Sequence, residues 1–340
     1  MSVTKRIQKV IKKSQSILII ISRPIDHDCI ASGVILKRYL RSLGKSVKLI
    51  APVKIPKDYE IMPFVKNMIV EDPKKANLGI YDLVIALDGG NKKQFARVEA
   101  NADFDFGGNK NVLNIDHHLT NSHFAKYEIW DKKASSTIEL LASTLLDIAK
   151  LTKEEATLIY FGLVGDTGNF KYSLSKDTLY LASLLLAKGA DYKTVVKHYF
   201  YSNTKLDFQI FTYLIDKTVY KKRLGYTYVI VDYDKIIEKF DCKAGLIKKG
   251  IKLYQDYFSC AVNGVNISVV FRVIGSNITA SLKGDALSNK IPLSDISRHL
   301  KVDGGGHFNS AGFALKGDIQ NVLADFRNVL IKMRKEYKQK

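Results

Sequence analysis

Four short segments of this chain combine carboxylates or imidazoles with a preceding apolar stretch. They are Ile25-Asp26-His27-Asp28, Leu87-Asp88-Gly89, Asp116-His117-His118 and Gly165-Asp166-Thr167-Gly168. Such groups are costly to gather away from water unless a cation or a proton compensates them. Because carboxylates outnumber imidazoles here, we expect manganese or magnesium before zinc. Two such ions side by side would polarise a phosphate and activate a water molecule.

The first segment allows two interpretations. On an extended or looped backbone, Asp26 and Asp28 would face one site while His27 points away, since side chains alternate with a period of two. The same carboxylates would serve equally well as caps of a helix that contains Ala31. Taken alone, this segment does not distinguish a metal site from a helix cap.

The other segments differ in how strongly they indicate a site. Asp88 stands before a glycine, as is common in turns, and Asp166 would fit a loop whose two glycines let the backbone approach a ligand. Asp116-His117-His118 is more specific, because adjacent histidines after an aspartate at a strand end favour a site over a plain surface. Near the C-terminus, Gly304-Gly305-Gly306-His307 predicts a glycine-rich turn whose N–H groups approach an anion, with His307 donating to a phosphate.

Apolar runs indicate the elements that must position these segments. Short apolar runs typical of strands covered on both faces occupy 16–21, 47–50, 83–87 and 112–115. Helical spacing over 31–43 follows the first run, and Gly44 ends it. We therefore expect an α/β fold with a parallel sheet, helices on both faces, and ligands beyond the carboxyl ends of the strands.

The rest of the chain predicts helices and then a second domain. Helices are expected at 136–149, 153–163 and 177–188, and again within 192–211, with a break at 201–203. Strands are expected at 226–231, 260–262, 267–271 and 278–282, and a last helix at 319–334. With 340 residues, two domains are the default. We place a first domain at 1–195, a connector at 196–218 and a smaller mixed α+β domain at 219–340.

Composition limits the class of protein. The net charge of +19 suits polyanionic ligands such as nucleotides, although a lysine-rich solvated surface explains it equally well. Cys29, Cys242 and Cys260 form no C-x-x-C pair, which favours a reducing, cytoplasmic location. We interpret Cys29 as a small buried residue rather than as a metal ligand. No run approaches the roughly 20 apolar residues of a membrane span, so no membrane partner is expected.

Taken together and in order, the motifs resemble the DHH phosphoesterase superfamily, and its DHH–DHHA1 branch in particular. The resemblance covers nearly the whole chain through the motifs at 25–32, 88, 116–118, 134–139, 165–170 and 304–313. Within that branch the chain is similar to nanoRNases that also act on 3′-phosphoadenosine 5′-phosphate (pAp), and to soluble phosphodiesterases of cyclic di-AMP. The resemblance implies a DHH catalytic domain followed by a DHHA1 substrate-binding domain.

The resemblance also implies two Mn²⁺ ions, with Mg²⁺ or Co²⁺ as substitutes. Asp26 would bind the first ion and Asp28 the second. Asp88 and Asp166 would contact both ions, and His117 would complete the second.

Further roles follow from the same resemblance. Asp116 would orient a histidine, and His118 would touch the scissile phosphate. His118, Asp88 and Asp166 are thus the expected catalytic residues, the two aspartates holding the attacking hydroxide through the ions. In the second domain, the residues expected to hold the other end of the substrate are Lys283, Gly305, Gly306 and His307, besides His118 itself.

Three positions depart from the family pattern. The family's first motif normally opens with a histidine where this chain has Ser22, which predicts weaker binding of the first ion or another metal preference. His27 stands where glycine is usual. Lys283 replaces an arginine, which exchanges a planar fork for a point charge and should loosen recognition of a phosphate.

The expected function is metal-dependent hydrolysis of short 5′-phosphorylated oligoribonucleotides and linear dinucleotides such as pApA to mononucleotides, with pAp as a further substrate. A soluble cyclic di-AMP phosphodiesterase is the first alternative, and a nucleotide-binding protein with weakened catalysis is the second. No stable complex with long nucleic acid is expected, and a homodimer remains an open alternative.

Overall fold

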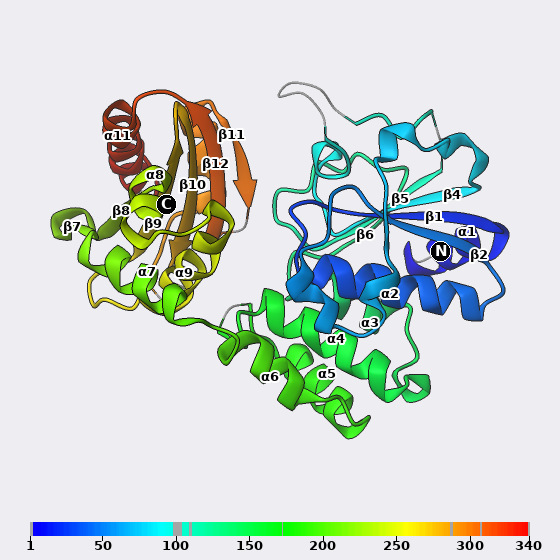
Figure 1. Cartoon of the computed structure of the whole chain (residues 1–340). Coiled ribbons are helices and arrows are strands. Elements are labelled where there is room, and N and C mark those ends of the chain that lie inside the picture. The colour runs from blue at the N-terminus through cyan, green and yellow to red at the C-terminus, as the bar shows by residue number, and fades with distance from the viewer. Residues whose placement is uncertain are drawn as a thin grey trace. The chain divides into compact units, whose positions relative to one another are not determined.

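The computed structural model describes residues 3–97, 104–108, 111–171, 173–285, 288–306 and 308–338. The chain divides into two compact units, Met1–Tyr201 and Ser202–Lys340 (Figure 1). Each unit contains one six-stranded sheet. Among the helices in the described ranges, none combines the length and the apolar character that crossing a membrane requires.

The first unit is built on a parallel sheet with the strand order β3-β2-β1-β4-β5-β6. Its strands are β1 (Ser16–Ile21), β2 (Ser46–Ala51), β3 (Ile69–Val70), β4 (Leu83–Leu87), β5 (Val112–Asp116) and β6 (Tyr127–Trp130). The four strands predicted from continuous apolar runs are all present, and they are the four central ones. The two edge strands lack such runs because they are less deeply covered, and β3 is exposed.

The α-helices of this unit pack on one face of the sheet. They are α1 (Val3–Lys13), α2 (His27–Ser42), α3 (Thr137–Thr144), α4 (Lys153–Asp166), α5 (Lys176–Ala187) and α6 (Tyr192–Phe200). Aromatic side chains such as Phe95 and Phe106 cover the other face, together with short 3-10 helices. The α/β class with helices on both faces is confirmed, but on this second face the described helices are 3-10 helices rather than α-helices. Four prolines between β2 and β4 explain the difference, since proline interrupts α-helices.

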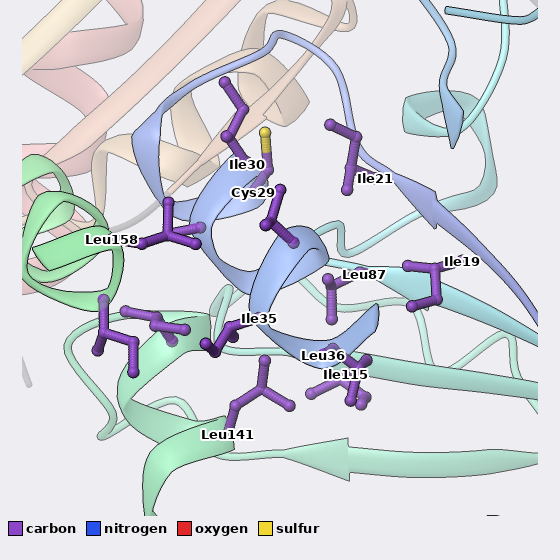
Figure 2. Packing of buried hydrophobic residues seen from close by; sticks show 14 of the residues in the cluster. Ile19, Ile21, Cys29, Ile30, Ile35, Leu36, Leu87, Ile115, Leu141 and Leu158 are labelled. Atoms are coloured by element: carbon purple, nitrogen blue, oxygen red, sulfur yellow. The ribbon is translucent and has the colours of Figure 1, made fainter. Parts of the chain in front are cut away.

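Helix α2 connects the core to the edge of the sheet where the acidic segments lie. Its Ile35 and Leu36 pack against Ile19 and Leu87 of the sheet and against Leu141 of α3 (Figure 2). Gly33 allows the close approach of helix and strand, because a Cβ atom there would lie 2.6 Å from Cγ2 of Ile21. Close packing of this kind fixes the N-terminus of α2 beside the carboxyl end of β1.

The second unit has a mixed sheet with the strand order β11-β12-β10-β9-β8-β7. The strands are β7 (Val219–Lys221), β8 (Tyr226–Asp232), β9 (Ile267–Ile274), β10 (Asn277–Gly284), β11 (Asp303–Gly306) and β12 (Ser310–Lys316). Strands β8 and β9 are parallel and the other neighbours antiparallel, which confirms the predicted mixed α+β character.

Helices cover both faces of this second sheet. One face packs on α10 (Ile296–Leu300) and α11 (Ile319–Lys338). The other packs on α7 (Lys205–Asp216), α8 (Tyr233–Phe240) and α9 (Ile247–Leu253).

Two predicted elements differ from the structure. The helix predicted at 136–149 ends at Thr144, because Asp147 accepts a hydrogen bond from the N–H of Ala149 and starts a separate 3-10 turn. The strand predicted at 260–262 is wrong, since these residues form turns. Gly264 follows them with a φ of +80°, a backbone conformation that does not continue a strand.

The glycine segment at 304–306 forms strand β11 rather than the predicted glycine-rich turn. Gly304 pairs with Phe313 and Gly305 with Gly312 on β12. His307, the fourth residue of this motif, lies outside the described residues.

Gly304→Ala should destabilise the second unit. A Cβ atom at Gly304 would meet the carbonyl oxygen of Gly312 and would lie 2.7 Å from Cβ of Ser297. We expect a loss of about 1–3 kcal/mol in the free energy of unfolding, the usual cost of overpacking, measured by urea denaturation. Gly245→Ala is the matched control, because nothing lies within 4 Å of its Cβ position. Equal midpoints for the two variants would contradict the close approach of β11 and β12.

Candidate metal centre

Asp26 lies at the start of helix α2, directly after the loop that follows β1. Its carboxylate caps the helix, and Oδ1 accepts a hydrogen bond of 2.9 Å from the N–H of Cys29. Asp26 itself has the extended backbone considered for this segment, whereas Asp28 follows in the first helical turn. Asp26 caps the helix and also belongs to an acidic cluster, because its carboxylate and that of Asp88 have oxygen atoms within 4.8 Å of each other.

The carboxylate of Asp28 is fully buried against the N-terminus of helix α3. Oδ2 accepts from the N–H of Thr137 at 2.6 Å, and Oδ1 accepts from the N–H of Ile138 at 2.9 Å. The hydroxyl of Ser32 donates to Oδ1 at 3.2 Å. A helix N-terminus stabilises a carboxylate through its unpaired N–H groups and its dipole. These residues orient Asp28 toward the site.

Thr137 also orients Asp88, which follows strand β4. Its hydroxyl donates to Oδ1 of Asp88 at 2.7 Å, and Asp88 is 2% exposed. The backbone of Asp88 has a φ of +62°, which aspartate tolerates better than most residues. The role of Thr137 was not predicted from the sequence. The sequence does indicate that a helix begins at Thr137, because Ser136 is a typical N-cap residue and stands directly before an apolar helix.

His117 follows strand β5 and faces two carboxylates. Its Nε2 lies 3.0 Å from Oδ2 of Asp166 and 3.8 Å from Oδ1 of Asp88. Its Nδ1 lies 3.2 Å from the carbonyl oxygen of Ala134, a contact that places the Nδ1 proton there and leaves Nε2 for the cluster.

Asp166 lies at the C-terminal end of helix α4 rather than in the predicted loop. The glycine before it serves packing, because a Cβ atom at Gly165 would lie 2.8 Å from Cβ of His27 and 2.9 Å from the hydroxyl of Tyr199. His27 in turn points to helix α6, where its Nε2 lies 2.8 Å from Nε2 of His198.

Asp116 orients the second histidine of the triplet. Oδ1 of Asp116 lies 2.6 Å from Nδ1 of His118, and Asn121 donates to Oδ2 of Asp116 at 2.7 Å. The indole of Trp130 donates to the backbone carbonyl of His118 at 2.9 Å. This arrangement fixes the ring of His118 and leaves its Nε2 on the other side of the ring from Asp116.

Ligand atoms of these residues form three groups, each with all atoms within 4.8 Å of one another. The groups are Asp88-His117-His118, Asp26-Cys29-Asp88 and Asp28-His117-Asp166. Because Asp88 and His117 each belong to two groups, the five predicted metal ligands form one connected cluster. Cys29, interpreted from the sequence as a buried residue, is buried and also belongs to this cluster.

The electrostatics of the cluster favour a bound cation. Burial and the charge of Asp166 raise the pKa of Asp26 to about 6. Burial and neighbouring carboxylates also raise the pKa values of Asp28 and Asp88. Burial works to lower the pKa of His117, but the hydrogen bond and charge of Asp166 outweigh it and raise this pKa to about 9. Four carboxylates and one imidazole therefore suit a hard divalent cation.

Ser22, at the position where the family pattern has histidine, is 3% exposed and lies directly after β1. Its N–H donates to the carbonyl oxygen of Leu87 at 3.1 Å. In the second unit, Nζ of Lys283 donates to the hydroxyl of Ser310 at 2.9 Å.

The stability that a divalent cation adds on binding to this cluster should increase with pH, and Mn²⁺ serves as the test ion. Without metal, the folded protein binds more protons than the unfolded chain does. The difference arises at Asp26 between about pH 4 and 6, and at His117 between about pH 6.5 and 9. Both raised pKa values make the metal-free protein lose stability as pH rises through these windows. A bound cation replaces these protons. We expect the difference in Tm between samples with Mn²⁺ and with EDTA to widen from about pH 5 to about pH 8.5. A constant difference would contradict the pKa shifts of the cluster.

Comparisons with known proteins agree with the fold. Residues 16–163 match the family described as "DHH family, N-terminal domain". A crystal structure of an exopolyphosphatase-related protein from Bacteroides fragilis superposes with a TM-score of 0.81 at 22% identity. It covers 99% of this chain and 97% of that chain, and shows that the two have the same fold.

Three curated relatives share parts of the sequence. "Probable bifunctional oligoribonuclease and PAP phosphatase NrnA" of Streptococcus mutans is 32% identical over 136 residues, which span 38% of this chain and 42% of the relative. "Bifunctional oligoribonuclease and PAP phosphatase NrnA" of Thermus thermophilus is 26% identical over 301 residues, or 86% and 82% of the two chains. "Cyclic-di-AMP phosphodiesterase PdeA" of Listeria monocytogenes is 24% identical over 204 residues, or 56% and 30%. Within residues 16–163, which are less than half of its length, this chain is similar to the N-terminal domain of the DHH family.

Proposed function

We propose that this protein is a divalent-metal-dependent phosphodiesterase that hydrolyses short 5′-phosphorylated oligoribonucleotides and linear dinucleotides such as pApA to mononucleotides. We include pAp as a further substrate. The observation that carries the proposal is the cluster of Asp26, Asp28, Asp88 and Asp166 around His117, in which Asp28, Asp88 and His117 are buried and Asp26 and Asp166 are half-buried. The names of the Streptococcus and Thermus relatives support the substrate class.

In this proposal the cluster holds two Mn²⁺ ions. Asp26 serves one ion, Asp28 and His117 the other, and Asp88 and Asp166 both. When bound, such ions would polarise a phosphate and lower the pKa of a water molecule. Mg²⁺ or Co²⁺ would substitute, since the oxygen-rich donor set suits several divalent ions.

His118 acts on the phosphate itself in the proposed reaction. With Nδ1 held by Asp116, its Nε2 is the nitrogen that can donate a hydrogen bond to a phosphate oxygen as negative charge develops. Asp116 therefore acts by positioning His118, and the hydrogen bond and charge of His118 lower the pKa of Asp116 although burial works to raise it.

We further propose a division of labour along the chain: a catalytic domain at 1–195, a connector at 196–218 and a substrate-binding domain at 219–340. Lys283, Gly305, Gly306 and His307 would hold the nucleotide away from the scissile bond. Lys283 supports this role as a half-buried cation on the sheet. A reducing cytoplasm would suit the free thiols of Cys29, Cys242 and Cys260.

Hydrolysis of cyclic di-AMP is the second candidate function, favoured by the name of the Listeria relative. A panel of pApA, pAp and cyclic di-AMP, incubated with the purified protein and Mn²⁺ and followed by product analysis, separates the candidates. We expect pApA to be converted to AMP fastest and EDTA to stop the reaction. Faster turnover of cyclic di-AMP than of pApA would favour the second candidate function over the first. Binding of these compounds without turnover of any of them would refute the assignment as an enzyme.

Ser22→His should tighten metal binding at the ion served by Asp26. An imidazole at this position adds a nitrogen ligand beside the carboxylates, and changes of this kind alter metal affinity by about 10–100-fold. The measurement is the Mn²⁺ concentration that gives half-maximal activity, with Ser46→His at the exposed start of β2 as the control. An unchanged Mn²⁺ requirement would show that Ser22 does not border this ion.

A further inference from the structure

A pocket of about 380 Å³ lies within the second unit, where residues of α8 and α9 and of the following turn meet strands β9 and β10. The side chains that matter here are Tyr233, Lys248, Lys252, Gln255, Arg272 and Lys283. The volume falls within the range of pockets that bind small molecules and cofactors. None of these residues except Lys283 has a role in the proposed hydrolysis.

The lining of the pocket is strongly basic. It contributes four cationic side chains and a single carboxylate, Asp256. That carboxylate forms an ion pair with Lys252 at 3.0 Å. The remaining positive charge favours an anionic ligand, because a concave site lined by one sign of charge concentrates ions of the opposite sign.

Arg272 on β9 is the most informative residue of the pocket. Its Nη1 donates to the hydroxyl of Ser281 at 2.7 Å, and its Nη2 donates to Oε1 of Gln255 at 3.3 Å. Both acceptors are neutral, and no carboxylate in the described part of the chain forms an ion pair with Arg272. Burial lowers the pKa of this guanidinium, which nevertheless stays charged at neutral pH. A half-buried cation without a carboxylate partner is costly unless a ligand supplies the negative charge.

The backbone beside Arg272 is also unusual. Helix α9 passes into a π-helical turn at Tyr254–Phe258, which carries Gln255 and Asp256. Single π-helical turns occur frequently at functional sites, because they displace side chains from the regular helical face. Here the turn presents Gln255 to the guanidinium and thereby holds the fork of Arg272 in place.

We propose that this pocket binds a mononucleotide through its phosphate, with Arg272 as the central contact. A guanidinium has five N–H donors, so the two hydrogen bonds to Ser281 and Gln255 leave donors for two phosphate oxygens. Lys248 is exposed at the pocket and adds charge, while Tyr233 offers a ring surface to the base. The inference goes beyond the proposed function, since it requires neither the metal cluster nor hydrolysis.

Calorimetric titration of the full chain with AMP in EDTA tests the proposal, with adenosine and inorganic phosphate as parallel ligands. We expect AMP to bind and Arg272→Gln to weaken it by at least about tenfold, the equivalent of one charge-assisted hydrogen bond. Arg272→Lys should recover part of the loss, because it restores the charge without the fork. Arg327→Gln on the opposite, α11 side of the sheet is the matched control and should bind AMP as the wild type does.

Three results would overturn the assignment of the ligand to this pocket, and a fourth would overturn the role of the phosphate. The first three are absence of AMP binding to the wild type, binding to Arg272→Gln as tight as to the wild type, and a loss of binding in Asp88→Asn, which would locate the ligand in the first unit. Binding of adenosine as tight as that of AMP would refute the role of the phosphate. If Arg272→Gln fails to fold, Lys248→Gln at the exposed rim takes its place, with a smaller loss expected. Because EDTA is present throughout, failure of the hydrolase assignment leaves these outcomes unchanged.

Discussion

Asp88→Asn should stabilise the metal-free protein and at the same time abolish the proposed metal-dependent hydrolysis. Burial, followed by the charges of Asp28 and Asp26, raises the pKa of Asp88, so an ionised carboxylate at this position is unfavourable without a cation. Asparagine removes the charge, keeps an oxygen for the hydroxyl of Thr137, and tolerates the positive φ of this residue. The variant therefore separates two effects of Asp88: the destabilisation of the metal-free protein by a buried negative charge, and the contribution to metal binding and hydrolysis.

The expected magnitudes are large enough to measure. In EDTA we expect Tm to rise by a few degrees, since about 1 kcal/mol shifts Tm by about 2–4 °C in a protein unit of this size. With Mn²⁺, turnover should fall by about three orders of magnitude, because metal ligation contributes several kcal/mol to transition-state stabilisation. The rise in Tm that we expect Mn²⁺ to cause in the wild type should also disappear.

Asp325→Asn, on the exposed surface of α11, is the control for the loss of one negative charge. It should leave turnover and the response to Mn²⁺ unchanged. A folded Asp88→Asn variant with a lower Tm in EDTA would contradict the repulsion among the buried carboxylates. Retained hydrolysis would remove Asp88 from the metal cluster.

His118→Ala should lower kcat strongly while leaving the stabilisation by Mn²⁺ in place. The expected loss is about 10²–10³-fold, as for the removal of one hydrogen-bond donor from a developing negative charge. KM should change far less, since the interaction is strongest in the transition state. The measurements are steady-state kinetics with pApA and the increase in Tm on addition of Mn²⁺.

His123→Gln is the matched control, because His123 is an exposed histidine of the same loop and its Nδ1 contacts Glu128 at 2.8 Å. This variant should retain the kcat of the wild type. Loss of the Mn²⁺-induced rise in Tm in His118→Ala would assign His118 to the ions rather than to the phosphate, in keeping with its place in the group with Asp88 and His117.

Local patterns in the sequence determined the centre of the first sheet and the positions of the acidic segments. Strands β1 and β4 have the predicted bounds, because a strand covered on both faces must be apolar at every position. Asp26, Asp88 and His117 could be placed beyond strand ends for the same reason, since an apolar run stops where the backbone leaves the core. Edge strand β3 carries no such signal, and the short apolar run at 260–262 was misleading, since these residues form turns.

Only the tertiary structure decided how these residues are held. Asp28 takes its hydrogen bonds from Thr137 and Ile138, more than a hundred residues away, and no local periodicity encodes such a pairing. Two glycines of the segments predicted to approach ligands also have a packing role: Gly165 lies against His27, and Gly304 is paired within a sheet. Arg272 gave no signal in the sequence, because its significance lies in partners that the fold brings to it. Periodicity reports which faces are buried, whereas the contacts between buried faces depend on how the elements pack.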